Sequence, residues 1–348
     1  MHDTRLHDCS HLGIDLGDRT CCYCGLSEGG SVLTRGKVAT SREALTQTFR
    51  DAPPLVIALE VGTHSTWVSR LLESLGHEVH VANPRRLPMI YADTHKSDEL
   101  DAENLARLVR YDRQLLRCVQ HRSEGAQRLL SFLRTRDQLV RSRTALINSA
   151  RGQAKSSGHR LPSCSPAAFH HRAREVVCGD DLQALQPYLN AIEALNHEIR
   201  ECDRTIEGWS EEVLPVTQRL REIAGVGPIT AAAFVLTLDD PERFSDSRKV
   251  GAYLGLVPRK RQTGQRDEQA HITKAGNELL RRLLVNASHY ILCRGPDTDL
   301  RRFGERIHAR GGARAYKIAV VAVARKLAVQ LHRIWITGER YEPLCATR

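Results

Sequence analysis

The first 110 residues alternate between strand-like and helix-like patterns in an order that few folds accommodate. Three strand-like runs come first, and the first two have the form of a hairpin. Helical and strand-like runs then alternate and end in an acidic helix. The strand-like runs are residues 11–17, 20–25, 31–40, 54–60 and 78–83, and the helical runs are residues 41–49, 63–76 and 97–108.

A hairpin meander followed by alternating strands and helices is the order of an RNase H-like α/β fold, which we predict for residues 1–115. Four carboxylates lie at ends of these runs. Asp15 ends the first strand, Glu60 ends the almost wholly apolar fourth strand, and Asp98 and Asp101 stand three apart at the start of a helix capped by Ser97. We expect them to meet at one edge of the sheet.

Four carboxylates brought together repel one another unless cations lie between them. Two Mg²⁺ ions about 3.5–4 Å apart, held by carboxylates, are the arrangement used in phosphodiester chemistry. The sequence therefore predicts a two-metal site at Asp15, Glu60, Asp98 and Asp101. The alternative is that these are ordinary surface acids, with the Asp98/Asp101 pair at a solvated helix end.

The composition and charge of the chain favour a globular protein that binds a polyanion. At 348 residues and 41% hydrophobic residues the chain is globular, and a net charge of +10 with a pI near 9.3 indicates a polyanionic partner, most simply nucleic acid. No apolar run is long enough for a bilayer and no signal-peptide pattern opens the chain, so we expect a cytoplasmic protein without membrane contact. Ten cysteines should then be mostly reduced thiols. We expect the cluster at Cys21, Cys22 and Cys24 to be buried or edge-strand thiols rather than zinc ligands.

Residues 120–214 read as a helical arm. Residues 123–157 and 180–214 each carry an apolar stripe, and a Gly/Pro/Ser-rich connector over 158–168 lets the second helix fold back antiparallel to the first. We predict a coiled-coil-like pair that also dimerises. Arg134 and Arg141, among other arginines of the first helix, either lie along nucleic acid or form a solvated face.

The sequence pattern of residues 215–348 predicts a mostly helical domain. Gly225 and Gly227 lie in a helix-hairpin-helix pattern, whose backbone N–H groups suit a DNA phosphate, although a plain helix turn fits the same letters. The most basic short segment of the chain follows and contains a hydroxyl beside a glycine, at Thr263. The chain ends in a helix over residues 315–335, with Ile318 and Val321 among its expected core residues. The cations of the basic segment are Arg259, Lys260, Arg261 and Arg266.

Several of these motifs resemble one known family. Gly13-Ile-Asp15, Leu59-Glu-Val-Gly-Thr63, Asn83-Pro-Arg-Arg86 and Lys96-Ser-Asp-Glu-Leu-Asp-Ala102 are similar to those of the DEDD transposases of the insertion-sequence one-ten family, the bridge-RNA-guided recombinases. The resemblance covers nearly the whole chain. It implies a RuvC-like domain joined to a domain with a nucleophilic hydroxyl, DNA as substrate, a structured guide RNA, and dimers that pair into a tetramer.

The resemblance also assigns the nucleophile. The family has a serine before a glycine, followed by Ile-Thr-Lys-Ala-Gly-Asn, and residues 272–277 match that motif at the same spacing, including Lys274. Thr263 therefore occupies the place of the serine. A threonine keeps the hydroxyl but adds a methyl group that stiffens χ1 and crowds an in-line attack. Three alternatives follow: a working threonine nucleophile, a slow or inactive copy, or cleavage by the acidic site alone.

Two other classes of protein compete with a recombinase. One is a Holliday-junction resolvase-like nuclease, in which the acids cut with metal-activated water. The other is a catalytically silent nucleic-acid-binding relative.

Overall fold

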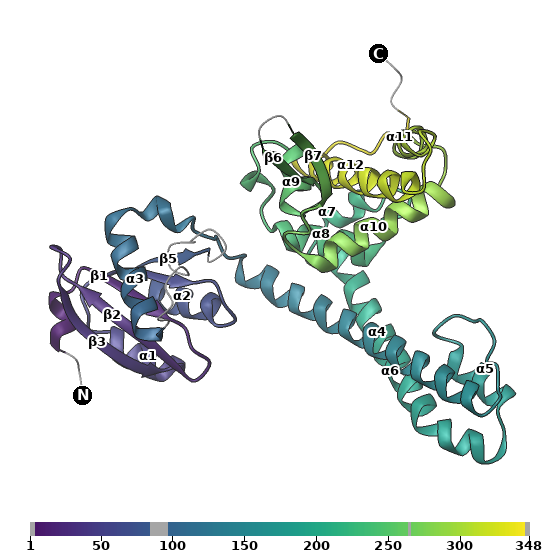
Figure 1. The fold of residues 1–348 in the computed structure, drawn as a ribbon, viewed down its shortest axis with the longest axis horizontal. Helices are drawn as coiled ribbons and strands as arrows, with labels where there is room; N and C mark the ends of the chain where they lie inside the picture. Colours follow the sequence, from purple (N-terminus) through teal and green to yellow (C-terminus); the bar gives the residue numbers. More distant parts are fainter. Residues whose placement is uncertain (1–3, 84–96, 264–265, 345–348) are drawn as a thin grey trace. The chain divides into compact units, whose positions relative to one another are not determined.

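The structure is a computed structural model that describes residues 4–83, 97–263 and 266–344, with the side chains of residues 260–270 left undescribed. It divides into two compact units, unit 1 over Met1–His121 and unit 2 over Arg122–Arg348 (Figure 1). The motif residues Pro84–Arg86 and Lys96, and the glycine after Thr263, lie outside the described residues.

Unit 1 is a mixed five-stranded sheet in the order β3-β2-β1-β4-β5. β1 pairs antiparallel with β2, and β2 with β3, whereas β1–β4 and β4–β5 are parallel. This confirms the predicted order of strands and helices and is consistent with an RNase H-like fold. The strands are β1 (His11–Asp15), β2 (Thr20–Leu26), β3 (Val32–Ala39), β4 (Val56–Glu60) and β5 (Glu78–Ala82), and the helices are α1 (Arg42–Phe49), α2 (Ser65–Ser74) and α3 (Asp98–Tyr111).

Helix α3 packs directly on β1. A Cβ added at Gly13 would stand 1.9 Å from the Ala102 oxygen and 2.5 Å from the Ala106 nitrogen, so helix backbone touches strand backbone there. Ser97 caps the helix by accepting a hydrogen bond from the Leu100 N–H, as predicted. The apolar pattern predicts an inner face of Leu100, Ala102, Leu105 and Leu108. This prediction is partly wrong, because the small side chains of Ala102 and Ala106 have to face Gly13. Leu100 and Leu108 are therefore only half-buried; the buried residues are Asp101, Ala102, Leu105, Ala106 and Val109.

The cysteine cluster lies inside β2. Cys21, Cys22 and Cys24 are all buried, which confirms the prediction of buried thiols. Burial is the main cause that raises the pKa of each of the three. They are therefore thiols rather than thiolates near neutral pH.

Unit 2 contains the arm and a helical bundle. α4 (Glu124–Ser156) and α6 (Gly179–Glu212) run antiparallel, as predicted: Leu130 and Leu133 pack with Ile206 at one end, and Ile147 packs with Leu189 near the other. The bundle core includes α8, whose residues are buried from Thr230 to Leu238. The remaining elements are α5 (Phe169–Val176), α7 (Val216–Leu220), α8 (Pro228–Leu238), α9 (Arg248–Tyr253), α10 (Glu278–Cys293), α11 (Asp299–His308), α12 (Ala315–Thr337) and the hairpin β6 (Pro258–Thr263) and β7 (Arg266–Ile272).

The inner face of the last helix differs from the expected one. Ile318 is 58% exposed and Val321 is only partly buried, whereas Ala319, Val320 and Val323 face the core. Apolar residues lie on more than one side of α12, so the sequence alone does not decide which side faces the core. Packing against α10 and α11 decides it. Among the described residues, no helix combines the length and hydropathy that a membrane crossing requires.

Replacement of Gly13 by alanine should destabilise unit 1 by roughly 2–4 kcal/mol, because the new methyl group meets helix backbone that has no freedom to rotate away. Amide hydrogen exchange of residues in β1 and β4 measures the loss. Gly29→Ala is the matched control, since its Cβ would have only the Ser27 Oγ nearby, at 3.8 Å. Equal protection in Gly13→Ala and the parent chain would contradict the close packing.

His77 should make unit 1 sensitive to mild acid. Its Nδ1 accepts a hydrogen bond from the Leu55 N–H at 3.3 Å and its Nε2 donates to the Phe49 carbonyl at 3.1 Å, so the buried ring is neutral. Burial, the main cause, lowers its pKa. Below about pH 6.5 the His77 side chain is protonated in the unfolded chain but stays neutral in the folded chain. The free energy of unfolding therefore falls by up to about 1.4 kcal/mol per pH unit.

Hydrogen exchange in β4, followed between about pH 7.5 and 5.5, measures this effect. The variant His77→Gln, less stable throughout, should show a flatter dependence on pH because its side chain does not titrate. A slope as steep in the variant as in the parent would assign the acid sensitivity to other groups.

Candidate functional site

Two of the four predicted acids lie at the ends of neighbouring strands. β1 and β4 run parallel with Ile14 opposite Leu59, so Asp15 and Glu60 follow at corresponding positions where the two strands end. Neighbouring strands are about 4.8 Å apart. Both acids are half-buried. The parallel register therefore brings together two carboxylates that are 45 residues apart in the chain.

The other two acids begin the helix that lies on the same strand. Because Gly13 touches the α3 backbone at Ala102, the residue before that contact, Asp101, starts close to the end of β1. Asp101 is only 9% exposed, whereas Asp98 one turn earlier is exposed. Charges on both Asp98 and Asp15 act to raise the pKa of Cys22, which pairs with Asp15 in the sheet. Asp15 and Asp98 therefore lie around the same residue.

Ion pairs hold the outer side of α3 over β2 and β3. Lys37 Nζ lies 3.0 Å from a Glu99 oxygen, and Arg35 Nη2 lies 2.6 Å from a Glu103 oxygen. Hydrogen bonds from Arg35, before all other causes, lower the pKa of Glu103. The helix start is thus fixed by contacts that do not use Asp98 or Asp101.

The chemistry of this donor set fits a hard divalent cation, since every donor is a carboxylate oxygen. Within the described residues, however, no three Asp, Glu, His or Cys side chains are grouped closely enough to hold an ion. The fold therefore brings Asp15 and Glu60 to adjacent strand ends and the Asp98/Asp101 turn to the same strand, but it does not show a finished metal site.

A second candidate site is the β6–β7 hairpin of unit 2. Thr263 is the last residue of β6 and pairs with Arg266, the first residue of β7, so the predicted nucleophile stands next to the connection between the strands. The side chains of Thr263, Lys260, Arg261 and Arg266 are outside the described part of the structure. Their backbone positions place this basic segment on one β-hairpin, an element that was not predicted from the sequence.

Backbone contacts fix the base of this hairpin. Gly255 and Gly276 have φ of +68° and +75°, and a Cβ on either would approach backbone atoms of the facing loop to 2.3 Å and 2.1 Å. The Lys274 N–H donates to the Gly255 carbonyl, and Arg281 donates to the carbonyls of Leu254 and Ala275. The Thr-Lys-Ala-Gly-Asn motif therefore packs against the loop before the hairpin and fixes the position of the hairpin base.

The cations predicted to contact nucleic acid differ in their surroundings. Lys274 is exposed at φ +54°, and Arg259 is exposed with one long hydrogen bond of 3.5 Å to the Thr273 carbonyl. Arg134 is exposed on α4. Arg141 instead contacts two acids, Asp137 and Glu278, at 3.1 and 3.2 Å. Its charge is already compensated within the chain.

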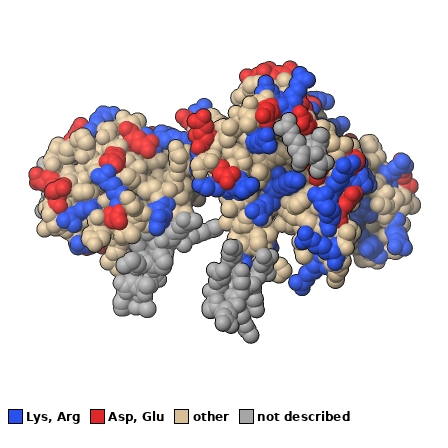
Figure 2. Space-filling model, turned by 90° about the horizontal axis from the view of Figure 1, so that it is seen from above, with Lys and Arg blue, Asp and Glu red and all other residues tan. Residues whose placement is uncertain are grey.

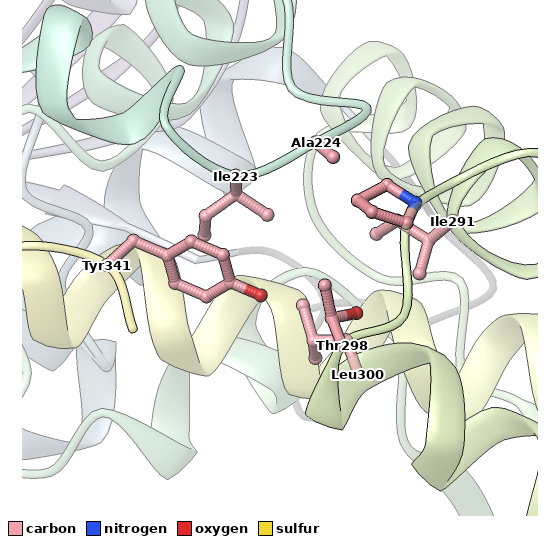
Figure 3. Close-up of a pocket in the computed structure, with 7 residues that line it drawn as sticks. Ile223, Ala224, Ile291, Thr298, Leu300 and Tyr341 are labelled. Atoms are coloured by element: carbon pink, nitrogen blue, oxygen red, sulfur yellow. The ribbon is translucent and has the colours of Figure 1, made fainter. Parts of the chain in front are cut away.

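The turn between α7 and α8 contains one glycine, Gly225, with a left-handed backbone. Gly225 has φ +93°, with Tyr290 and the Ala287 carbonyl against it, and Gly227 is the exposed residue before α8. Below the turn, Ile223 and Ala224 face Ile291 across an apolar crevice (Figure 3). This crevice is too narrow for a water molecule, so it is packing that supports the turn.

The ion pairs around Asp137 were not predicted from the sequence. Its side chain accepts hydrogen bonds from Arg141 and from Arg282 of α10, and Arg141 reaches Glu278 at the start of α10. These contacts tie α4 to the helix that follows the Lys274 loop. No local signal reveals them, because Asp137 and Arg282 are 145 residues apart.

Comparison with known proteins identifies the family. A DEDD transposase model of the IS110 group, described as "Transposase", matches residues 12–156, and a model described as "Transposase IS116/IS110/IS902 family" matches residues 217–303. The chain is 31% identical to a putative transposase, y4pF/y4sB, of Sinorhizobium fredii over 95% of this chain and 85% of the relative. It is 29% identical to a probable family 20 transposase of Pseudomonas aeruginosa over 96% and 99% of the two chains.

A third relative is the transposase for insertion sequence element IS1111A of Coxiella burnetii, which is 28% identical over 82% of this chain and 79% of its own length. The first matched stretch contains Asp15, Glu60, Asp98 and Asp101, and the second contains Thr263. The matches thus cover both candidate sites, and the chain belongs to the IS116/IS110/IS902 family of transposases.

Proposed function

We propose that the protein is the DNA transposase of an insertion sequence and that it cuts and rejoins DNA with bound Mg²⁺ and a hydroxyl nucleophile. The observation that carries this proposal is the parallel pairing of β1 with β4, which sets Asp15 beside Glu60. Packing of α3 on Gly13 adds Asp98 and Asp101 to the same end of the sheet. Carboxylates at one end of a mixed sheet, in a family of transposases, suit phosphodiester chemistry.

Asp15, Glu60, Asp98 and Asp101 would hold two Mg²⁺ ions, which when bound activate the attacking oxygen and stabilise the leaving one. The acids themselves set the position of that chemistry. Asp101 is buried in the α3 face, and Asp98 extends from the exposed first turn. The positive end of the helix dipole stabilises both carboxylates, and Ser97 caps the helix start by accepting a hydrogen bond from the Leu100 N–H.

Thr263 would supply the nucleophile of the recombination step. Its Oγ1 attacks the DNA phosphorus, a bond to the 5′ phosphate forms, and the bond to the neighbouring 3′ oxygen breaks. The proton lost by the hydroxyl balances the one gained by that oxygen. Attack by another 3′ hydroxyl then reverses the link and rejoins DNA. The rigid hairpin base at Gly255 and Gly276 would aim this hydroxyl.

Nucleic-acid contacts would come from both parts of unit 2. Arg259, Lys260, Arg261 and Arg266 lie in the hairpin strands, and Lys274 follows them. These cations would neutralise the phosphate under attack. The exposed turn at Gly225 and Gly227 and the arm residues Arg134 and Arg141 would contact the backbone elsewhere. Arg141 has to leave its acidic partners to do so, so we rank Arg134 above it.

The family resemblance adds two partners to this proposal: a structured guide RNA, and further copies of the chain as dimers that pair into a tetramer. The antiparallel α4–α6 arm, with its apolar seam, is the element that we propose for self-association as a coiled coil.

Asp15→Asn and Glu60→Gln should each lower Mg²⁺-dependent strand cleavage at least about 100-fold, because each removes a negative oxygen donor without changing shape. Chelation of the metal with EDTA should have the same effect on the parent chain. Cleavage of a labelled plasmid that carries the element's ends measures both. Glu73→Gln, an exposed acid on α2, is the matched control and should leave the rate unchanged. Unaltered cleavage in the two site variants would rule out the acidic site.

Thr263→Ala and Thr263→Ser separate the three possible roles of the hydroxyl. A covalent nucleophile predicts loss of protein–DNA adducts with alanine and a rise of several-fold with serine, because the crowding methyl group is removed. Denaturing gels of DNA-bound protein detect the adduct. Cleavage that persists in Thr263→Ala without any adduct would instead support a resolvase-like nuclease. A parent chain with no cleavage that binds DNA would support the silent relative.

A further inference from the structure

The chain from Arg306 to Gly338 contains only positive charges, of which Arg333 pairs with Glu339 just beyond the segment. It contains seven Lys and Arg residues and no Asp or Glu, so it supplies a charge equal to seven of the net +10. On the face drawn in Figure 2, Lys and Arg side chains gather in groups over unit 2. The seven cations are Arg306, Arg310, Arg314, Lys317, Arg325, Lys326 and Arg333.

Four of these cations surround the turn from α11 to α12, and we name this set the α11–α12 basic turn: Arg306, Arg310, Arg314 and Lys317. All four are exposed, and none forms a salt bridge to another described residue. The arginines just before them differ. Arg301 pairs with Glu305 at 2.8 Å, and Arg302 pairs with Asp297 at 2.6 Å. The nearby acids are thus taken by other arginines.

Two of these four charges oppose the dipole of α12, whereas Arg306, in the last turn of α11, is placed favourably. Arg314 precedes α12 and Lys317 lies in its first turn, where the helix dipole is positive and no acid is present. A cation there costs roughly 0.3–1 kcal/mol of stability. Repulsion between the four like charges adds to that. Binding of an external polyanion would offset both costs.

The shape of the turn suits close approach of a nucleic-acid backbone. Gly311 and Gly312 lie between Arg310 and Arg314 with φ of +75° and +98°, and nothing stands within 4 Å of where their Cβ atoms would be. The next turn of α12 presents Ile318, 58% exposed, beside these cations. Cations around an open, side-chain-free turn contact phosphates without reading bases.

The basic turn is separate from the nucleophile hairpin. Arg325 lies against Gly251 of α9, the helix that leads into the hairpin, whereas Arg314 is eleven residues away along α12. At 1.5 Å per residue this is about 16 Å. Figure 1 shows α11 and the β6–β7 hairpin at opposite sides of the bundle.

We propose that the α11–α12 basic turn is a second docking surface of unit 2 for the phosphodiester backbone of a nucleic-acid duplex, distinct from the contacts at the hairpin. The inference rests on the proposed function, since it assumes a nucleic-acid substrate. The occupant that we propose is duplex DNA, which supplies the backbone phosphates and is what a transposase acts on.

The test compares binding by two triple variants of the full chain, both carrying Asp15→Asn so that no DNA is cut. Arg310→Ala/Arg314→Ala/Lys317→Ala removes three unpaired charges. The control Arg128→Ala/Arg172→Ala/Arg204→Ala removes three exposed arginines of the arm that are paired with Glu124, Glu175 and Glu201. Fluorescence anisotropy with a 30-base-pair DNA duplex and, separately, a duplex RNA hairpin is recorded over a range of salt concentrations.

For DNA, loss of three phosphate contacts should reduce the slope of log K against log salt by about 2.7 and weaken binding about 100-fold near 0.15 M salt. The control should change both much less. Weakening with DNA supports the surface, whereas weakening with the RNA hairpin alone would overturn DNA as its occupant. Equal effects of the two variants, or no effect of the first, would overturn the inference. Neither outcome bears on the proposed function, which the cleavage assay with Asp15→Asn tests separately.

Discussion

The contact between helix and strand at Gly13 is the constraint on which the acidic site depends. Because Gly13 has no side chain, the α3 backbone at Ala102 and Ala106 lies directly on β1. Any larger residue would push the helix outward and carry Asp98 and Asp101 away from Asp15. The ion pairs of Glu99 and Glu103 with Lys37 and Arg35 then fix the rotation of the helix, while burial of Leu105 fixes its depth. The backbone contact at Gly13 and the two ion pairs therefore favour the same position of the start of α3.

Unit 2 uses the same principle at its hairpin. Gly255 and Gly276 let two loops touch through backbone alone, and Arg281 joins them with hydrogen bonds to carbonyls. Asp137 connects this region to α4 through Arg141 and Arg282. A reactive hydroxyl on a two-stranded hairpin needs a fixed base, since such a hairpin has little stability of its own. The bundle, rather than the hairpin itself, provides it.

Much of the fold could be predicted from the sequence. Local patterns located the strands of unit 1, the cap at Ser97 and the two long helices of the arm, because propensity and apolar periodicity act over a few residues. The inner faces of α3 and α12 were partly mistaken. In both helices apolar residues are spread over more than one face, and a distant partner selects among them: Gly13 for α3, and α10 with α11 for α12.

The sequence by itself determined the kinds and order of the elements, the excess of basic residues, and the four carboxylates and one hydroxyl that carry the predicted chemistry. Only the tertiary structure decided which of these groups meet. The parallel register set Asp15 beside Glu60, and folding compensated Arg141 while leaving the α11–α12 basic turn unpaired. The physical reason is that strand pairing, backbone contact and ion pairing join residues far apart in the chain, whereas propensity and periodicity report only on neighbours.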